Sequence, residues 1–277
     1  MPDTLRLTLT VSPDAREALV ADLADWGFDA FEETDDGVVA YAPVARWDAT
    51  TREAVDRRVG GAGWHAETVE DQDWNATWEA SLEPVVAGPF VVAPSWADLG
   101  PEHEGLTPLR VDPKMAFGTG YHESTRLVLR LLPDVVRPGA RVLDVGTGTG
   151  ILSIAALALG AASALGVDID PWSVTNGDEN AARNGVGDRF EVREGSLDVV
   201  PEDAFDLVLA NIIRSVLVPM LPDLVQKAAP RAPIVLAGLL VTEREALLDA
   251  AGGAGLALDR EASENEWWAC VLRGDEG

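Results

Sequence analysis

The chain has 277 residues, of which 47% are hydrophobic and 25% are charged, and its formal net charge at pH 7 is −26. This composition predicts a folded protein of about two domains, and it argues against nucleic-acid binding because no basic patch could release counterions from phosphates. The longest apolar stretch, residues 151–167, contains serines and glycines and is shorter than the ~20 residues that span a bilayer. We therefore expect a cytoplasmic protein, and we expect it to be a monomer.

The acidic balance has two explanations. In a highly salted cytoplasm a dense acidic surface keeps a protein soluble, while salt screens the repulsion between its charges. Alternatively, an acidic surface attracts a basic partner. Acidic residues are spread along the whole chain, which favours the first explanation, although both can hold at once.

Residues 1–70 are predicted to form a small α+β unit. Ser12 is the expected N-cap of its first helix, and residues 35–37 give a hairpin signal between two of its strands. The expected order of elements is a strand at 4–11, a helix at 13–26, strands at 28–32 and 38–42, a helix at 48–59 and a strand at 64–69. This β-α-β-β-α-β order is that of a ferredoxin-like unit, a topology that supports many functions.

Residues 71–84 are predicted to form a connecting helix. Trp74, Trp78 and Leu82 fall four residues apart and therefore share one face, and Pro84 ends the helix. We favour a role for these tryptophans in docking the helix onto a domain over a role in substrate binding.

Residues 85–277 alternate between expected strands and helices. The strands are expected at 90–93, 107–111, 141–145, 164–168, 190–193, 207–210, 234–237 and 267–272, and the helices at 123–132, 151–159, 172–184, 215–227 and 242–252. Several strands are continuous apolar runs, which favours an α/β domain with a doubly wound, mostly parallel sheet covered on both faces. The single cysteine, Cys270, lies in such a run and is expected to be buried, and no Cys/His cluster has the spacing of metal ligands.

A glycine-rich turn gives the strongest chemical signal. An apolar strand runs into Asp144-Val145-Gly146-Thr147-Gly148-Thr149-Gly150, and a predicted helix follows at once. Glycines let a ligand approach the backbone closely, and ligands of doubly wound sheets bind at the carboxyl ends of strands. An NAD fingerprint would need its third glycine at Ile151, and a P-loop would need a lysine that is missing here.

Two further apolar strands end in polar residues at the same edge of the sheet. Asp168 comes 22 positions after Gly146, where a carboxylate can accept hydrogen bonds from both hydroxyls of a ribose. The alternative for Asp168 is a helix cap, for which Asp170 is the better candidate because Pro171 follows it. Asn211 ends another strand, and its carbonyl oxygen could accept a hydrogen bond from an incoming amine; the alternative is a turn-forming asparagine.

The spacing of Asp144, Gly146, Gly148 and Gly150 resembles motif I of the class I methyltransferases, whose cofactor is S-adenosylmethionine. The resemblance implies that this loop wraps the methionine part of the cofactor and that Asp144 helps to fix it. It also implies that Asn211 stands in motif IV, which faces the methyl group to be transferred.

A second glycine-rich loop narrows the resemblance to one family. Residues 112–125, with Phe117-Gly118-Thr119-Gly120 at their centre, resemble the signature of the methyltransferases that modify large-subunit ribosomal protein eleven. This implies a ferredoxin-like domain that grips the ribosomal protein, a flexible connector, and methylation of lysine side chains and the N-terminal amine. The residues implied to contact the cofactor are Thr125, Gly146, Asp168 and Asn211. Phe117 and Thr119 are implied to close over the cofactor and its methyl group.

Two other hypotheses stay open. The chain could be a class I methyltransferase with another protein or a small molecule as acceptor, or a non-catalytic binding protein built on the same fold. The intact Gly146, Asp168 and Asn211 argue against the second of these. His122 is a possible general base, although a hydrogen-bonded structural histidine is the favoured interpretation.

Overall fold

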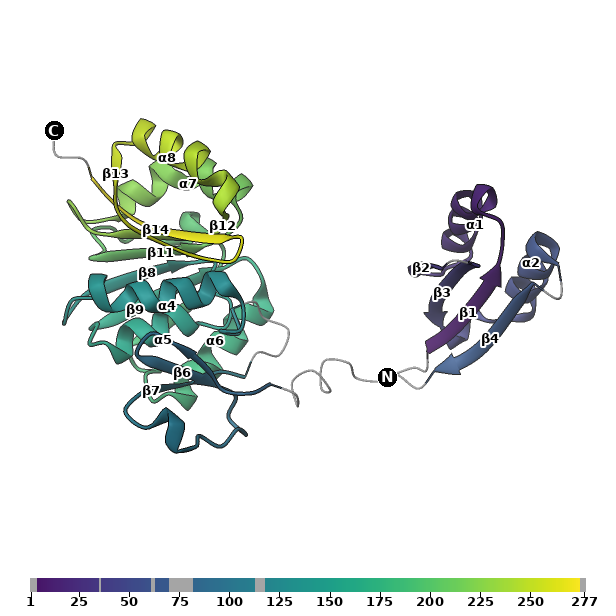
Figure 1. The fold of residues 1–277 in the computed structure, drawn as a ribbon, viewed down its shortest axis with the longest axis horizontal. Helices are drawn as coiled ribbons and strands as arrows, with labels where there is room; N and C mark the ends of the chain where they lie inside the picture. The colour runs from purple at the N-terminus through teal and green to yellow at the C-terminus, as the bar shows by residue number, and fades with distance from the viewer. Residues whose placement is uncertain (1–3, 35, 61–62, 70–81, 113–117, 275–277) are drawn as a thin grey trace. The chain divides into compact units, whose positions relative to one another are not determined.

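The computed structural model describes residues 4–34, 36–60, 63–69, 82–112 and 118–274 (Figure 1). The chain divides into two compact units, Met1–Trp78 and Glu79–Gly277. The division falls within the predicted connector, of which residues 70–81, including Trp74 and Trp78, lie outside the described ranges. Residues 82–84, at the end of that connector, have no regular secondary structure.

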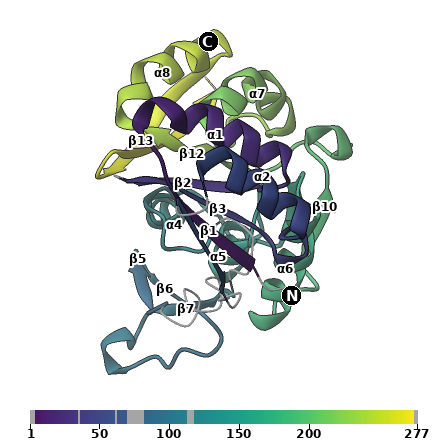
Figure 2. The same ribbon diagram turned by 90° about the vertical axis from the view of Figure 1, so that its right-hand side faces the viewer.

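The N-terminal unit has the predicted order of elements. These are β1 (Thr4–Thr10), α1 (Pro13–Asp25), β2 (Ala30–Thr34), β3 (Gly37–Pro43), α2 (Ala49–Val59) and β4 (Trp64–Val69). The strands form one antiparallel sheet in the order β2-β3-β1-β4, as expected of a ferredoxin-like unit. Figure 2 shows the two helices of this unit, α1 and α2.

Buried and partly exposed side chains alternate along β1, and the buried ones form part of the core of this unit. Leu5, Leu7 and Leu9 are buried, whereas the residues between them are partly exposed. The three leucines pack with Leu19 of α1 and Val55 of α2, so one face of the sheet is covered by the helices.

The larger unit is built on a seven-stranded sheet. Its strands are β8 (Arg141–Val145), β9 (Ser163–Asp168), β10 (Phe190–Glu194), β11 (Leu207–Asn211), β12 (Ile234–Leu240), β13 (Leu256–Glu264) and β14 (Trp267–Gly274). Their spatial order is β10-β9-β8-β11-β12-β14-β13; β14 pairs antiparallel with both β12 and β13, and the other neighbouring strands pair parallel. The expected doubly wound, mostly parallel sheet is therefore confirmed.

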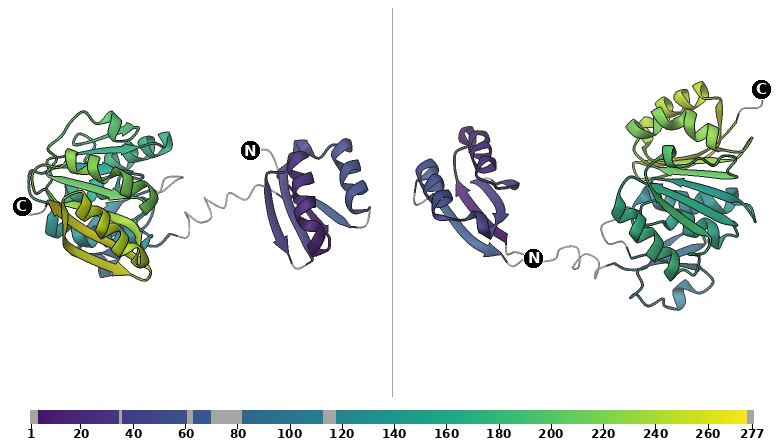
Figure 3. Two further views of the ribbon diagram at one scale, coloured as in Figure 1. Left: turned by 90° about the horizontal axis from the view of Figure 1, so that it is seen from above. Right: turned by 180° about the vertical axis from the view of Figure 1, so that it is seen from behind.

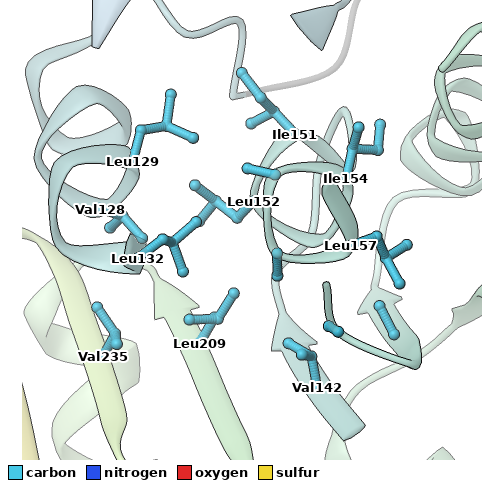
Figure 4. Close-up of a cluster of buried hydrophobic side chains, with 14 of the residues drawn as sticks. Val128, Leu129, Leu132, Val142, Ile151, Leu152, Ile154, Leu157, Leu209 and Val235 are labelled. Atoms are coloured by element: carbon cyan, nitrogen blue, oxygen red, sulfur yellow. The ribbon is translucent and has the colours of Figure 1, made fainter. Parts of the chain in front are cut away.

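Helices cover both faces of this sheet (Figure 3). They are α4 (Glu123–Val135), α5 (Ile151–Ala158), α6 (Pro171–Arg183), α7 (Arg214–Lys227) and α8 (Arg244–Gly253). Adjacent residues of β8 point to opposite faces: Val142 packs with α4 and α5, as Figure 4 shows, and Leu143 packs with α7 and α8. None of the described helices is long and apolar enough to cross a membrane.

Three shorter strands form a separate sheet. They are β5 (Val85–Ala87), β6 (Phe90–Ala93) and β7 (Thr107–Arg110), in the order β5-β6-β7. The sequence places 90–93 and 107–111 in strands, which the structure confirms, but it does not separate them from the main sheet. Phe90, Val92 and Leu109 attach the small sheet to the core under α4 and α5. Short 3-10 helices complete the described fold at Val44–Arg46, Pro101–His103, Leu197–Val199 and Val241–Glu243.

Candidate cofactor site

A cavity of about 400 Å³ lies at the carboxyl ends of the parallel strands. The strand order reverses between β8 and β11, and such a switch point is where open α/β sheets bind ligands. Four of the residues predicted to contact the cofactor meet in its wall, namely Thr125, Gly146, Asp168 and Asn211, and Gly148 joins them. Most of the remaining wall is apolar and includes Val145, Ile151, Leu152, Val167, Ile169, Ile212, Ile213, Val216 and Met220.

The glycine-rich turn brings backbone to the cavity. Gly146 and Gly148 have φ values of 69° and 54°, a region that favours glycine. A Cβ at Gly146 would lie 3.0 Å from Cγ1 of Ile212, so a side chain there would crowd the cavity wall. The N–H of Gly146 donates to the carbonyl of Val167 over 2.8 Å, which fixes the turn against β9.

Asp168 ends β9 and faces this turn. Its Oδ2 accepts the Gly148 N–H over 2.8 Å, and its Oδ1 accepts the Asp170 N–H over 3.0 Å. Each carboxylate oxygen has a second lone pair, so both can also accept hydroxyl hydrogens from a ligand in the cavity. Asp170 instead caps α6, since its Oδ1 accepts the Trp172 N–H over 3.0 Å. Asp170 therefore takes the capping position that the sequence predicts, and Asp168 lies in the cavity wall.

Asp144 and Gly150 lie behind the loop, outside the group of residues that line the cavity. Asp144 is 1% exposed, and its Oδ2 accepts hydrogen bonds from the hydroxyls of Thr147 and Ser153, each over 2.8 Å. Burial raises the pKa of the Asp144 carboxyl to about 6. A Cβ at Gly150 would lie 2.6 Å from Cε1 of Phe190. Both residues thus act on the shape of the loop from its protein side.

Thr125 and Asn211 meet although 86 residues separate them. Thr125 is fully buried in the first turn of α4, and its Oγ1 accepts the Nδ2 of Asn211 over 3.4 Å. This contact uses an amide hydrogen of Asn211, so it does not occupy the carbonyl oxygen, which is the acceptor of this side chain. Thr119 is half-buried and lies outside the cavity lining, which its neighbour Gly118 joins, whereas the predicted contact residue Phe117 lies outside the described residues.

His122 has a structural setting. It is the N-cap of α4, and its Nδ1 accepts the Ser124 backbone N–H over 3.2 Å. Its ring packs edge-to-face on Trp267, with 4.4 Å between ring centroids. These contacts favour the structural interpretation over a role as general base.

A polar cluster beside the loop was not predicted from the sequence. Asn176 and Asn180 of α6 are buried and hydrogen-bond to the backbone of Asp112 and Thr149. The available signal was their spacing of four residues, which places two poor helix formers on one face of a helix. Asn184 continues the row and bonds to the backbone of Arg110.

Together the fold and the site define a class I methyltransferase, with S-adenosylmethionine as methyl donor. The residues present fit this cofactor: a glycine turn for close approach, a carboxylate at the end of β9 for a ribose, and an amide at the end of β11. The cavity, at about 400 Å³, is in the usual range for small-molecule sites.

Comparisons with known proteins identify the family. The family model described as ribosomal protein L11 methyltransferase (PrmA) matches residues 28–275. A ribosomal protein L11 methyltransferase of Symbiobacterium thermophilum is 44% identical over 74% of this chain, a match that spans 66% of that relative. The one from Chlorobaculum parvum is 32% identical over 97% of this chain and 96% of its own length. The chain belongs to the ribosomal protein L11 methyltransferase family.

A solved structure supports this family assignment. A crystal structure of ribosomal protein L11 methylase from Lactobacillus delbrueckii subsp. bulgaricus has a TM-score of 0.64 and 29% sequence identity. The match covers 70% of this chain and all of that chain, so it extends well beyond the glycine-rich turn.

Proposed function

We propose that this protein transfers methyl groups from S-adenosylmethionine to amino groups of ribosomal protein L11, both lysine side chains and the N-terminal amine. The observation that carries the proposal is the family match over residues 28–275, which includes the cavity residues and much of the N-terminal unit. Relatives that match nearly the whole chain bear the same name, which supports L11 as the acceptor.

The predicted site residues have separate proposed roles. Asp168 would accept hydrogen bonds from the ribose hydroxyls, and the turn at Gly146 and Gly148 would contact the methionine part of the cofactor. Thr125 orients the Asn211 amide through the 3.4 Å hydrogen bond between them. The carbonyl oxygen of Asn211 would then accept a hydrogen bond from the incoming amine and orient its nitrogen for methyl transfer. Phe117 and Thr119 are proposed to close over the cofactor.

The chemical demand on the protein is small. S-adenosylmethionine supplies a methyl group that is already activated by its sulfonium, so alignment of the amine is the main contribution of the site. The amine must be neutral: losing a proton at pH 7 costs about 4.6 kcal/mol for a lysine of pKa about 10.4, and about 1.4 kcal/mol for an N-terminal amine of pKa about 8. The apolar wall of Ile212 and Ile213 lowers this cost, because it disfavours the charged amine.

The N-terminal unit is proposed to recognise the acceptor protein. Its own helices cover one face of the ferredoxin-like sheet, and we propose that the opposite face contacts the acceptor. The chain's formal net charge of −26 favours approach of a lysine-bearing, positively charged segment.

Peptide mapping tests the acceptor chemistry. Purified L11 is incubated with the protein and S-adenosylmethionine, digested, and sequenced by mass spectrometry. We expect methyl groups on lysine side chains and on the N-terminal amine, and a large loss of both with Asn211→Ala. Methyl groups on other side chains would contradict the amine assignment, whereas unmethylated L11 would direct the search to a different acceptor protein or a small molecule.

A further inference from the structure

Helix α6 carries two buried asparagines on the side that faces the glycine-rich turn. Asn176 is 3% exposed and Asn180 is fully buried. Buried amides lower stability unless each polar atom finds a partner, so the partners of these side chains indicate what holds them there.

Asn180 joins two segments of backbone that are distant in sequence. Its Nδ2 donates to the carbonyl of Thr149 over 3.0 Å, and its Oδ1 accepts the N–H of Asp112 over 3.1 Å. Asn176 supports the same junction, because its Nδ2 donates to the Asp112 carbonyl over 2.9 Å and its Oδ1 accepts from Asn180 over 3.2 Å.

Both segments lead directly to the cavity. Thr149 follows the cavity-lining Gly148, and its hydroxyl donates to the carbonyl of Gly118, another lining residue, over 2.5 Å. Asp112 is 7% exposed and is fixed from the other side by an ion pair with Arg183 of 2.9 Å and by hydrogen bonds from Ser95. One side-chain amide therefore ties the glycine-rich turn to an anchored point of the small-sheet region.

We propose that Asn180 is a positioning residue for S-adenosylmethionine: its amide holds Thr149, and through Thr149 the turn that binds the cofactor, in register with Asp112 and Gly118. The proposal rests on the cofactor site assigned above and is independent of which protein is methylated. Asn180 touches no reacting atom, so its effect is on the geometry of the residues that do.

The same helix supplies a matched control. Asn184, one turn further along, accepts the Arg110 N–H over 2.9 Å and donates to the Arg110 carbonyl over 2.7 Å. It thus docks α6 onto the neighbouring backbone with an equivalent pair of hydrogen bonds, and its hydrogen-bond partners in the described residues are the backbones of Arg110 and Asn180 rather than the glycine-rich turn. Asn184→Ala therefore shows how cofactor affinity and stability change when only the docking of α6 is weakened.

Two substitutions separate the functions of Asn180. Asn180→Ala removes the bonds to Thr149, Asp112 and Asn176 together. Asn180→Asp keeps an acceptor for the Asp112 N–H and loses the amide donor to the Thr149 carbonyl and to Oδ1 of Asn176. Arg183, whose guanidinium lies 3.4 Å from Oδ1 of Asn180 and pairs with Asp112, lies beside the carboxylate that Asn180→Asp introduces, and the unfolding midpoint shows whether this variant folds.

The experiment compares the full-length variants by calorimetry with S-adenosylmethionine, together with unfolding midpoints without cofactor and the KM for each substrate. We expect Asn180→Ala and Asn180→Asp to weaken cofactor binding roughly tenfold or more, because a buried carbonyl loses its donor, while Asn184→Ala changes the affinity less than about threefold at a similar loss of stability. The KM for cofactor rises in both Asn180 variants, and the KM for the acceptor protein stays near its original value.

Two results would overturn the inference. Wild-type affinity in Asn180→Asp would show that the Thr149 bond does not set the binding geometry. Equal weakening in the Asn180 and Asn184 variants would show that α6 docking alone is responsible. Failure of the unsubstituted protein to bind S-adenosylmethionine would instead refute the cofactor assignment, so the two failures are distinguishable.

Discussion

Asp168 holds two backbone N–H groups and still has lone pairs that face the cavity. We expect Asp168→Ala to weaken S-adenosylmethionine binding by ~1–3 kcal/mol, because ribose hydroxyls and the Gly148 N–H lose their acceptor. Isothermal calorimetry measures this directly. Unchanged affinity would refute the assignment of this carboxylate to the ribose.

Asp170 is the matched control for that substitution. It lies two residues away, carries the same side chain, and caps α6 rather than lining the cavity. Asp170→Ala is expected to lower the free energy of unfolding by about 1 kcal/mol, since the helix loses its cap, and to leave cofactor affinity nearly unchanged.

Asp144 gives the protein a pH-dependent stability. Its pKa is raised by burial from 3.8 to about 6, so the folded state favours the protonated form. The free energy of unfolding should therefore fall as pH rises from about 4 to about 6, by roughly 3 kcal/mol from this group, and Asp144→Asn should lack that fall. Urea unfolding of both proteins between pH 4 and pH 7 checks it. Parallel profiles would contradict the buried, protonatable state of Asp144.

Single residues show how far the sequence could predict the site. The pattern of strand ends was sufficient to place Asp168 at the ligand-facing edge of the sheet and Asp170 at the cap of α6, because each position depends on local chain order. It could not place Asp144 behind the loop, since burial depends on Ser153 and the packing of α5. It also could not reveal Asn180, whose partners Asp112 and Thr149 are distant in sequence.

At the scale of elements, an irregularity in β12 lies against the cavity wall at Ile212. Its pairing with β14 shifts register between Leu236 and Leu239, and Gly238 there has a φ of 80°. A Cβ on Gly238 would lie 2.8 Å from the backbone oxygen of Ile212, which lines the cavity. Gly238→Ala is expected to lower the free energy of unfolding by more than about 1 kcal/mol and to weaken cofactor binding, as denaturant unfolding and calorimetry would measure.

Gly252 is the control for this substitution. It lies in α8, where an added Cβ meets nothing within 4 Å, so Gly252→Ala should raise the free energy of unfolding by roughly 0.5–1 kcal/mol. If both substitutions changed the free energy of unfolding in the same direction, the close contact at Gly238 would not explain the effect of Gly238→Ala.

The bounds of a strand were predictable where nearly all of its residues are buried. Strand β8 matches its predicted bounds of 141–145 because it is apolar and lies at the centre of the sheet. Strand β13 was missed because it is an edge strand, mostly exposed along its length, and its sequence LALDREASE lacks the pattern of a buried strand. The separate small sheet was also not foreseen, since apolar runs do not state which neighbour they pair with.

At the scale of the whole molecule, the two units are proposed to have separate tasks. The larger unit has its own hydrophobic cores and contains every residue that lines the cavity. Removing residues 1–78 should therefore leave S-adenosylmethionine affinity within about twofold and reduce methylation of L11 below detection, because recognition of the acceptor is lost. Calorimetry and an intact-mass assay on the truncated protein measure the two effects. Full activity of the truncated protein would contradict the recognition role of the N-terminal unit.

The measurement that tests the central claim most directly is the intact mass of large-subunit ribosomal proteins after incubation with this protein and S-adenosylmethionine. The assay is best run in high salt, which screens the repulsion within a chain of net charge −26. We predict mass increases in steps of one methyl group that are confined to L11. Unchanged L11, under conditions in which cofactor binding is demonstrated, would contradict the proposed acceptor while leaving the methyltransferase fold in place.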